Sequence, residues 1–365
     1  MHDDKSVTMT HHLGVDAGGT STRAVVLDSH GCALGYGRSG SGNPISAGPA
    51  VAAASLRAAT TQALAGAGLG GSAISTTAVA MAGGSSVTDD PTVASSIRSA
   101  LVPTGMTAAV TIEKDLLALY FSGTPEPDGY ALVAGTGAAA VRVRGGEVEA
   151  VCDGLGWLLG DDGSGFWIGR EVARAVAAAL DGRGPATALT PMLLAAGAPV
   201  PTTEAGPVDG LTFNASLPHD RAGERGLLPE IVRRVYGLRP VQLAQYAPLA
   251  FEATRLAHDA VAEDIVTRAG HALAATLAAV VTTDLDGPLV MGGSVLVNQA
   301  AVRDIVSDVG PGRRPRAAGD GTRRRPVVVV PDGLVGAAVL SLRNAGIQVD
   351  ATVFDTVTRS LGRLR

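Results

Sequence analysis

The sequence has few of the residues that stabilise small secreted proteins or bind nucleic acid. Its two cysteines, Cys32 and Cys152, lie far apart, and neither belongs to a Cys-x-x-Cys pair. This spacing excludes a disulfide framework and a local zinc finger, and it fits a reduced, cytoplasmic protein. Lysine occurs only at Lys5 and Lys114, and the formal net charge is −5. We therefore expect no nucleic-acid partner.

Long apolar runs and aromatic residues are also scarce. No stretch reaches ~20 apolar residues without a charged residue or a turn former, so we expect no membrane partner. The polar residues 1–12 lack the apolar segment of a signal peptide. Aromatic residues make up 3% and hydrophobic residues 46% of the 365 positions. The chain can therefore bury two cores, built mainly from Ala, Val and Leu.

What the chain does contain is one order of elements that occurs twice. Turn formers and apolar alternation predict a three-strand meander, then helix, strand, helix and strand, near 13–17, 22–28, 33–39, 50–64, 76–81, 92–101 and 108–112. A looser second copy has strands near 130–134, 138–144, 147–151, 288–291 and 326–330, with helices from about 165, 297 and 334. This repetition predicts an α/β protein with two similar domains that face a cleft.

The expected domains differ in size. We place the N-terminal α/β domain at 1–114 and the larger C-terminal α/β domain at 115–365. A largely helical insert, about 172–281, enlarges the second domain, and its clearest part is the apolar-periodic stretch 260–283.

A glycine-rich turn joins the first two expected strands, in the segment DAGGTST at 16–22. Gly18 and Gly19 allow the backbone to approach an anion closely, so that N–H groups and the hydroxyls of Thr20 and Thr22 can bind phosphate oxygens. Asp16, at the strand end, could hold Mg²⁺ directly or through water. A hairpin follows, so this is neither a Walker A loop nor a dinucleotide loop. The alternative is an ordinary glycine turn.

A second glycine turn occupies the matching position of the second copy. Gly135, Thr136 and Gly137 lie between the strands expected at 130–134 and 138–144. Two such turns can bind one polyphosphate from both sides, which favours a phosphate site over two unrelated turns.

A carboxylate follows the last strand of the first copy. Asp115 lies between that strand and an apolar helix over 116–121. There it could accept the proton of a substrate hydroxyl that attacks the γ-phosphate of ATP. A helix N-cap is the alternative role, and the two can coexist. Sequence alone does not separate Asp115 from its neighbours Glu113 and Lys114.

Two further glycine-rich segments are candidate binding loops. Residues 154–165 contain five glycines, Trp157 and the adjacent acids Asp161 and Asp162. This composition favours a shaped loop in which Asp161 binds sugar hydroxyls, although it also fits a helix entry. The segment MGGSV at 291–295 could bind a nucleoside over its glycine backbone, or could be a small-residue strand–helix loop.

These motifs together resemble the sugar-kinase, Hsp70 and actin superfamily, and most of all the N-acetylglucosamine kinases and BadF/BadG-type ATPases. The matching segments lie at 14–28, 41–44, 81–84, 132–137, 154–169 and 291–298. The resemblance implies two ribonuclease-H-like domains of the actin/hexokinase type with a central cleft. It also implies ATP and Mg²⁺ as cofactors, phosphorylation of an amino sugar on its 6-hydroxyl, and a homodimer. N-acetylglucosamine is the first candidate substrate.

The resemblance also implies roles for individual residues. The groups assigned to ATP phosphates are Gly18, Gly19, Thr20, Gly135, Thr136 and Gly137, and those near the adenosine are Gly292, Gly293 and Ser294. The sugar would contact Asn43, Gly83, Gly154 and Asp161. Asp115 would be the base, and Asp16 would assist Mg²⁺.

The chain departs from the family pattern at a few positions near the expected sugar. Leu155 stands where the kinases often have Trp, and Ala138, Lys114 and Asp162 replace a frequent Ser, Asn and Glu. Alternatives are therefore a kinase for glucosamine or N-acetylmuramic acid, an iron–sulfur ATPase that activates a dehydratase, and a non-catalytic ATP or sugar sensor. The placement of the two cysteines argues against the activator, and the presence of Asp115 argues against the sensor.

Overall fold

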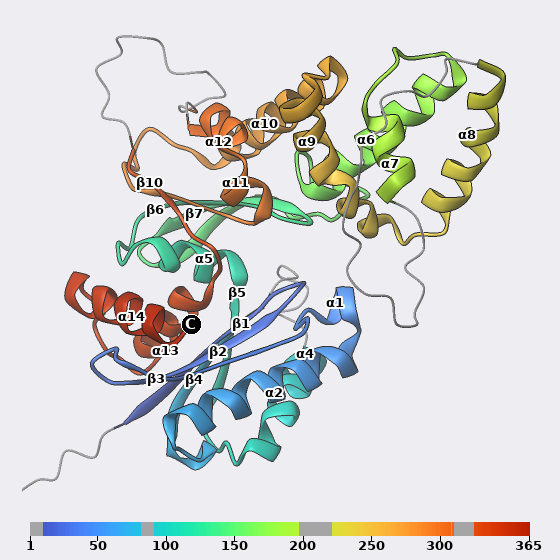
Figure 1. The fold of residues 1–365 in the computed structure, drawn as a ribbon. Helices are drawn as coiled ribbons and strands as arrows, with labels where there is room; N and C mark the ends of the chain where they lie inside the picture. Colours follow the sequence, from blue (N-terminus) through green and yellow to red (C-terminus); the bar gives the residue numbers. More distant parts are fainter. Residues whose placement is uncertain (1–9, 82–90, 197–220, 308, 310–324) are drawn as a thin grey trace, which may run out of the picture.

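Two mixed β-sheets form the framework of the computed structural model, which describes residues 10–81, 91–196, 221–307, 309 and 325–365 (Figure 1). Each sheet has five strands, in the orders β3-β2-β1-β4-β5 and β10-β9-β6-β7-β8. The strands of the first sheet are β1 His11–Ala17, β2 Thr22–Asp28, β3 Ala33–Ser39, β4 Ile74–Met81 and β5 Val110–Lys114. Those of the second are β6 Gly129–Ala134, β7 Ala138–Arg144, β8 Glu147–Asp153, β9 Leu289–Gly292 and β10 Val327–Val329.

The two sheets have the same topology. In each, an antiparallel meander is followed by two parallel strands: the first pairs with the first strand of the meander, and the second pairs with the first of the two. The pair Ala17↔Thr22 closes the first hairpin, and Ala134↔Ala138 closes the second. Both glycine turns therefore lie at equivalent hairpin tips, as the repeated order of elements predicts.

Helices α2 (Pro49–Ala67) and α4 (Pro91–Leu101) cover the outer face of the first sheet. Their core contains Leu13, Val15 and Leu56 among its fully buried side chains. Gly37 on β3 allows the close approach of α2, because a Cβ there would overlap the carbonyl of Ala59.

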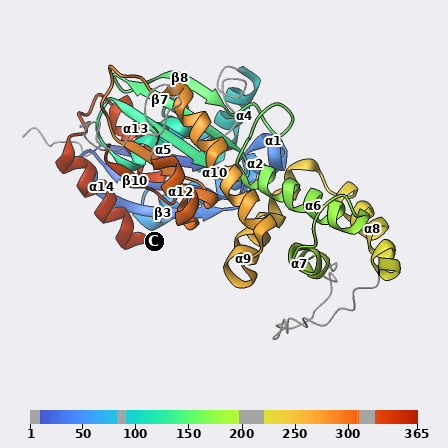
Figure 2. The same cartoon turned by 90° about the horizontal axis from the view of Figure 1, so that it is seen from above.

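The outer face of the second sheet is covered by α10 (Ala260–Val280), which contacts β7 and β8 (Figure 2). A group of helices extends to one side of it: α6 Gly165–Asp181, α7 Leu189–Ala196, α8 Arg221–Tyr236, the 3₁₀ segment Pro240–Tyr246 and α9 Ala247–Ala257. Short helices α11 (Ser294–Asn298) and α12 (Ala300–Ser307) follow β9. None of the helices in the described ranges is both long and apolar enough to cross a bilayer.

A third core lies between the two sheets, where two cores were expected. Helices α5 (Asp115–Gly123) and α13 (Leu334–Asn344) pack together there, in contact with strands of both sheets (Figure 1). Their backbones meet closely, because a Cβ on Gly336 would overlap the carbonyl of Ala118. The two sheets are therefore joined through one closely packed pair of helices.

The chain returns to the first sheet after β10. We expected the helix from 334 to complete the second unit, whereas α13 packs on β1 and β4. It is followed by α14 (Ala351–Leu364), a helix that the sequence reading missed, which packs on β3. The division into 1–114 and 115–365 stays a prediction, and these two helices lie beyond its boundary but on the first sheet.

Candidate active site

Asp115 is the first residue of α5, directly after β5. The helix cap is Lys114, and the Oδ1 atom of Asp115 accepts the N–H of Leu116 at 2.9 Å, so Asp115 does not serve as the N-cap. The protein around its carboxylate, followed by the negative charge of Asp16, raises the pKa of Asp115 to about 7. Glu113 instead accepts a hydrogen bond from Asn344 on α13. Of these two acids on either side of Lys114, Asp115 is therefore the one whose carboxylate is influenced by Asp16.

Asp16 lies on β1, next to the first glycine turn, and is buried. Its Oδ2 atom accepts the N–H of Gly333 at 3.2 Å and lies 3.4 Å from Nη1 of Arg23. Burial and then the charge of Asp332 raise the pKa of Asp16 to about 6, against the influence of Arg23. Asp16 thus belongs to a cluster with an excess of negative charge.

The remaining members of this cluster, Asp332, Arg23 and Arg365, were not predicted from the sequence. Nε of Arg23 lies 3.4 Å from Oδ2 of Asp332, and Oδ1 of Asp332 lies 2.7 Å from Nη2 of Arg365. Asp332 precedes α13, and its Oδ1 accepts the N–H of Leu334. The sequence around Asp332 offers one local indication, an acidic residue and a glycine before an apolar helix. This pattern is common and does not by itself indicate a functional residue.

The carboxylates of this cluster are ligands of the kind that Mg²⁺ takes in proteins. The charge of Asp332 acts on Asp16 and that of Asp16 acts on Asp115, and Arg23 and Arg365 balance part of the negative charge. The described residues contain no group of three or more acidic, His or Cys side chains arranged to hold a metal by themselves. Asp16 would therefore share Mg²⁺ with water and phosphate oxygens, as Mg²⁺ usually binds.

The first glycine turn places its polar groups in different surroundings. Gly19 and Thr20 are exposed at the hairpin tip, where a ligand can reach them. Thr22 is fully buried, and its hydroxyl donates to the carbonyl of Gly40 at 2.9 Å. The N–H of Gly42 donates to the carbonyl of Gly18 at 3.0 Å. This bond brings the segment with Asn43 beside the turn.

The second glycine turn is contacted by two other predicted segments. Gly293, with φ of 86°, caps α11, and a Cβ there would overlap the backbone of Ala134. Gly292 ends β9, and Ser294 is exposed. The N-terminus of α6 also meets this turn, where the N–H of Gly165 donates to the carbonyl of Gly135 at 2.7 Å. Gly293 therefore lies against the backbone of Ala134 and Gly135, at the second turn.

Asp161 also lies against the second turn. Its Oδ1 accepts the N–H of Ala138 at 2.9 Å, and a Cβ on Gly137 would lie 2.6 Å from the same oxygen. Gly154 begins the loop that leads to Asp161 with φ of 73°. Gly83, the remaining residue expected to contact sugar, lies outside the described residues.

The predicted residues thus form two groups. Asp16, Gly18, Asn43 and Asp115 lie at the carboxyl ends of strands in the first sheet, while Gly135, Gly137, Asp161 and Gly293 lie at those of the second. Helix α5 begins at the first group and packs against β6 and β9, which lead to the second. A nucleotide that extends from one group to the other would contact both glycine turns.

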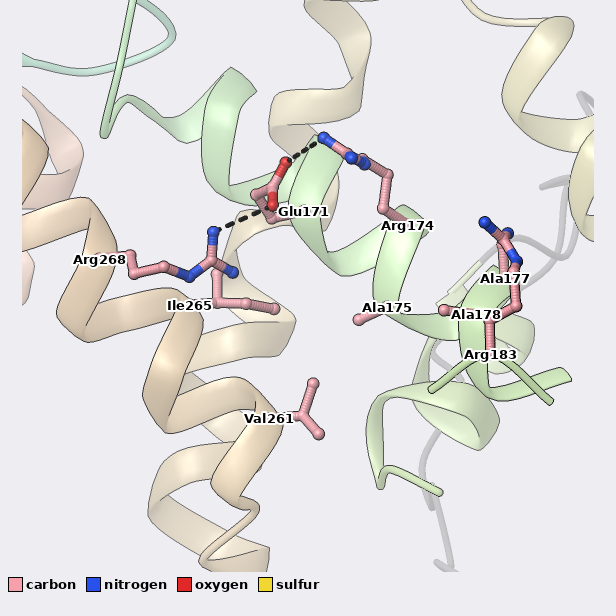
Figure 3. A pocket seen from close by; sticks show the side chains of 9 residues that line it. All are labelled: Glu171, Arg174, Ala175, Ala177, Ala178, Arg183, Val261, Ile265 and Arg268. Atoms are coloured by element: carbon pink, nitrogen blue, oxygen red, sulfur yellow. Dashed lines mark hydrogen bonds and ion pairs between the residues drawn. The ribbon is translucent and has the colours of Figure 1, made fainter. Parts of the chain in front are cut away.

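A cavity of about 330 Å³ lies elsewhere, between α6 and α10 (Figure 3). Its arginines already have acidic partners: Arg268 pairs with Glu171 and Asp264, and Arg174 pairs with Glu171. The cavity therefore has little unbalanced positive charge, and the site residues named above do not line it.

Part of the chain is similar in sequence to a known sugar kinase. An N-acetyl-D-glucosamine kinase of Dictyostelium discoideum is 29% identical over 190 residues, which are 50% of this chain and 59% of that protein. The match thus spans less than two thirds of the relative's own length.

Solved structures show the same fold. A candidate N-acetylglucosamine kinase from Chromobacterium violaceum gives a TM-score of 0.65 at 22% identity, over 91% of this chain and 99% of that chain. A candidate N-acetylglucosamine kinase from Porphyromonas gingivalis gives 0.62 at 21% identity, over 92% and 99%. A ROK family glucokinase from Streptomyces griseus, solved with glucose and AMPPNP, gives 0.50 at 17% identity, over 92% and 99%.

These likenesses confirm the expected fold class, that of the actin/hexokinase-like sugar kinases. A sequence model of one family matches residues 13–340, which is most of the chain. The chain belongs to the BadF/BadG/BcrA/BcrD ATPase family.

Proposed function

We propose that the protein is an ATP-dependent sugar kinase that phosphorylates the 6-hydroxyl of an amino sugar. The observation that carries the proposal is the Asp115 carboxylate, whose pKa is raised to about 7 beside Asp16. A general base works best when its pKa lies near the working pH. The similarity to N-acetyl-D-glucosamine kinases supports N-acetylglucosamine as the first candidate substrate.

Each group of residues has one part in the proposed reaction. Thr20 and the N–H groups of the first turn hold phosphate oxygens, and the turn 135–137 holds them from the other side. Gly292, Gly293 and Ser294 receive the adenosine. Asp16 would hold Mg²⁺ directly or through water, and the ion would supply positive charge beside the phosphates.

The sugar side of the site is proposed to work by orientation and proton transfer. Asn43, Gly83, Gly154 and Asp161 hold the sugar so that its 6-hydroxyl faces the γ-phosphate. Asp115 accepts the hydroxyl proton as the oxygen attacks, which requires that its carboxylate be ionised. The exclusion of water by closure around the sugar would limit wasteful hydrolysis of ATP.

The exact sugar is decided by the residues around its substituents. Leu155 is 65% exposed in this structure, in the place where related kinases often have Trp. Glucosamine and N-acetylmuramic acid are therefore the alternative substrates. We further propose a cytoplasmic homodimer that uses no nucleic-acid or membrane partner.

A coupled assay of ADP release over a panel of sugars tests the proposal. The panel is N-acetylglucosamine, glucosamine, N-acetylmuramic acid and glucose, each with ATP and Mg²⁺, and NMR of the product locates the phosphate. We expect sugar-dependent ADP release and a 6-phosphate. ATP binding without sugar-dependent turnover would favour the non-catalytic sensor instead.

The dehydratase activator is tested by a different measurement. Cys32 lies between β2 and β3, and Cys152 lies in β8, so the two belong to different sheets. An iron–sulfur cluster would give visible absorbance in protein purified without oxygen. We expect none, and a stoichiometric cluster would overturn the kinase assignment.

A further inference from the structure

The loop that follows β8 gains little from burial of its apolar side chains. Leu155, Leu158 and Leu159 are 65%, 74% and 77% exposed. Trp157 makes an edge contact with Phe166, with ring centroids 6.1 Å apart. Apolar burial is the dominant favourable contribution to folding, and a segment with little of it must be held by other contacts, here polar ones.

Asp153, the last residue of β8, supplies these polar contacts. Its Oδ1 accepts the N–H of Asp161 at 2.8 Å and that of Leu155 at 3.4 Å. Its Oδ2 accepts the N–H of Asp162 at 3.3 Å. Hydrogen bonds to an ionised acceptor are stronger than those between neutral groups. One carboxylate thus joins the two ends of the loop.

The backbone at both ends of this contact is unusual. Asp153 has φ of 65° and Asp161 has φ of 60°, in the left-handed region that residues other than glycine rarely adopt. Such residues persist where their surroundings hold them, and they are common at functional sites. Gly160 completes the arrangement, because a Cβ there would overlap the Asp153 carboxylate. A residue with a side chain therefore does not fit at position 160 while Asp153 makes these contacts.

Asp161 is the residue that this arrangement orients. It is buried, and its Oδ1 accepts the N–H of Ala138 at the end of the second glycine turn. We propose that Asp153 is a positioning residue, which fixes the backbone of Asp161 so that the Asp161 carboxylate is oriented toward a substrate hydroxyl. The substrate in this statement rests on the proposed function, whereas the contact between Asp153 and Asp161 does not.

The charge of Asp153 also affects the pKa of Asp161, which gives a second measurable effect of changing Asp153. Burial, together with the charges of Asp153 and Asp162, raises the pKa of Asp161, and the N–H of Ala138 lowers it. A neutral residue at 153 therefore lowers the pKa of Asp161. If an ionised Asp161 binds sugar, the acidic limb of kcat/KM for sugar moves to lower pH. This shift tests whether an ionised Asp161 binds sugar, and amide exchange tests whether Asp153 holds the backbone of Asp161.

Three variants separate geometry from charge. Asp153→Gly removes the carboxylate, and glycine adopts the positive φ at this position readily. Backbone strain therefore cannot explain a loss of sugar affinity in this variant. Asp153→Asn keeps one acceptor for the Asp161 N–H and removes the charge. Asp162→Asn, at an exposed neighbour, removes a charge and keeps the three hydrogen bonds to Asp153. Hydrogen exchange of the ligand-free protein and steady-state kinetics are measured for each.

We expect faster amide exchange over 155–162 in Asp153→Gly and near wild-type exchange in Asp162→Asn. The KM for sugar should rise about tenfold to a hundredfold in Asp153→Gly, with a smaller change in the KM for ATP, as for loss of hydrogen bonds to a charged group. Asp153→Asn should be intermediate, and its acidic limb should move to lower pH.

Three outcomes of the exchange and kinetic measurements would contradict the proposals, each in a different way. Unchanged exchange in Asp153→Gly would overturn the positioning role. Faster exchange with an unchanged KM for sugar would show that the contact holds the loop without serving the substrate, which also overturns it. If the wild-type protein phosphorylates no sugar, the proposed function fails, and the exchange data still decide whether Asp153 holds Asp161.

Discussion

Asp115 and Asp16 lie at the carboxyl ends of β5 and β1, and the negative charge of Asp16 raises the pKa of Asp115. The two strands flank β4 in the first sheet, so their ends meet at one edge. Burial contributes more to this shift than the neighbouring charge does. The pair therefore sets the protonation state of the proposed base before any ligand arrives.

The first prediction concerns removal of that base. Asp115→Asn keeps the shape of the side chain but cannot accept a proton, so kcat should fall about 10²–10⁴-fold, the range for general-base catalysis. Calorimetric titration with a non-hydrolysable ATP analogue should give an affinity within a few-fold of wild type. Glu113→Gln, which alters the neighbouring acid bonded to Asn344, is the control. A kcat of Asp115→Asn close to that of the control would reject the role.

Asp115→Asn should also raise the folding stability of the protein, although it lowers kcat. The folded-state pKa of Asp115, about 7, lies above the ordinary value of 3.8, so the folded protein binds this proton more tightly than the unfolded chain does. Stability from this group is therefore complete below about pH 4 and is lost as pH rises through about 7. Ligand-free Asp115→Asn should gain up to about 4 kcal/mol over wild type at pH 8 and little at pH 4.

Thermal unfolding in EDTA at pH 4, 6 and 8 measures this difference. The gain in Tm of Asp115→Asn over wild type should increase from pH 4 to pH 8. A constant difference across this range would show that the pKa of Asp115 is not raised in the folded protein.

Local sequence signals were enough for the framework and for the hairpin tips. Strands β2 and β3 occupy the residues expected from apolar alternation, 22–28 and 33–39. Their turns carry glycine and polar residues, which are strong local signals. The motif Gly135–Thr136–Gly137 could be placed because it lies between the first two strands of the second meander, as the first glycine turn does in the first meander. The fold class and the family resemblance are therefore confirmed.

Long-range contacts were not accessible from the sequence. Asp332 and Arg23 meet only because α13 returns to the first sheet, and the order of elements does not specify against which sheet a helix packs. Helix α14 was missed because its buried residues, Val357 and Leu361, are few among polar neighbours. The role of Asp153 was missed because it depends on two left-handed residues that are not glycines.

The next prediction concerns Arg23, which lies between Asp16 and Asp332. Its positive charge lowers the pKa of Asp16, so Arg23→Gln should raise that pKa and leave Asp16 protonated to higher pH. The Mg²⁺ concentration for half-maximal activity should therefore rise more at pH 6.5 than at pH 8.5. Arg38→Gln is the matched control, since Arg38 is the exposed β3 partner of Arg23 in the strand register.

Equal effects of the two substitutions at both pH values would contradict this explanation. A rise at pH 6.5 that disappears at pH 8.5 in Arg23→Gln alone is the expected result, because Asp16 is ionised at pH 8.5 in both proteins.

The last prediction concerns the contact between the second glycine turn and Asp161. A Cβ on Gly137 would lie 2.6 Å from Oδ1 of Asp161, so Gly137→Ala must displace either the turn or the carboxylate. If the turn holds ATP phosphates and Asp161 holds sugar, the KM values for both substrates should rise, each by about tenfold or more, as for loss of hydrogen bonds to a charged group. Gly362→Ala, on exposed α14 with open space around its Cβ, is the control and should leave both values unchanged. A rise in only one KM would show that the turn and Asp161 move independently, and an unchanged pair of values would place ATP and sugar away from this contact.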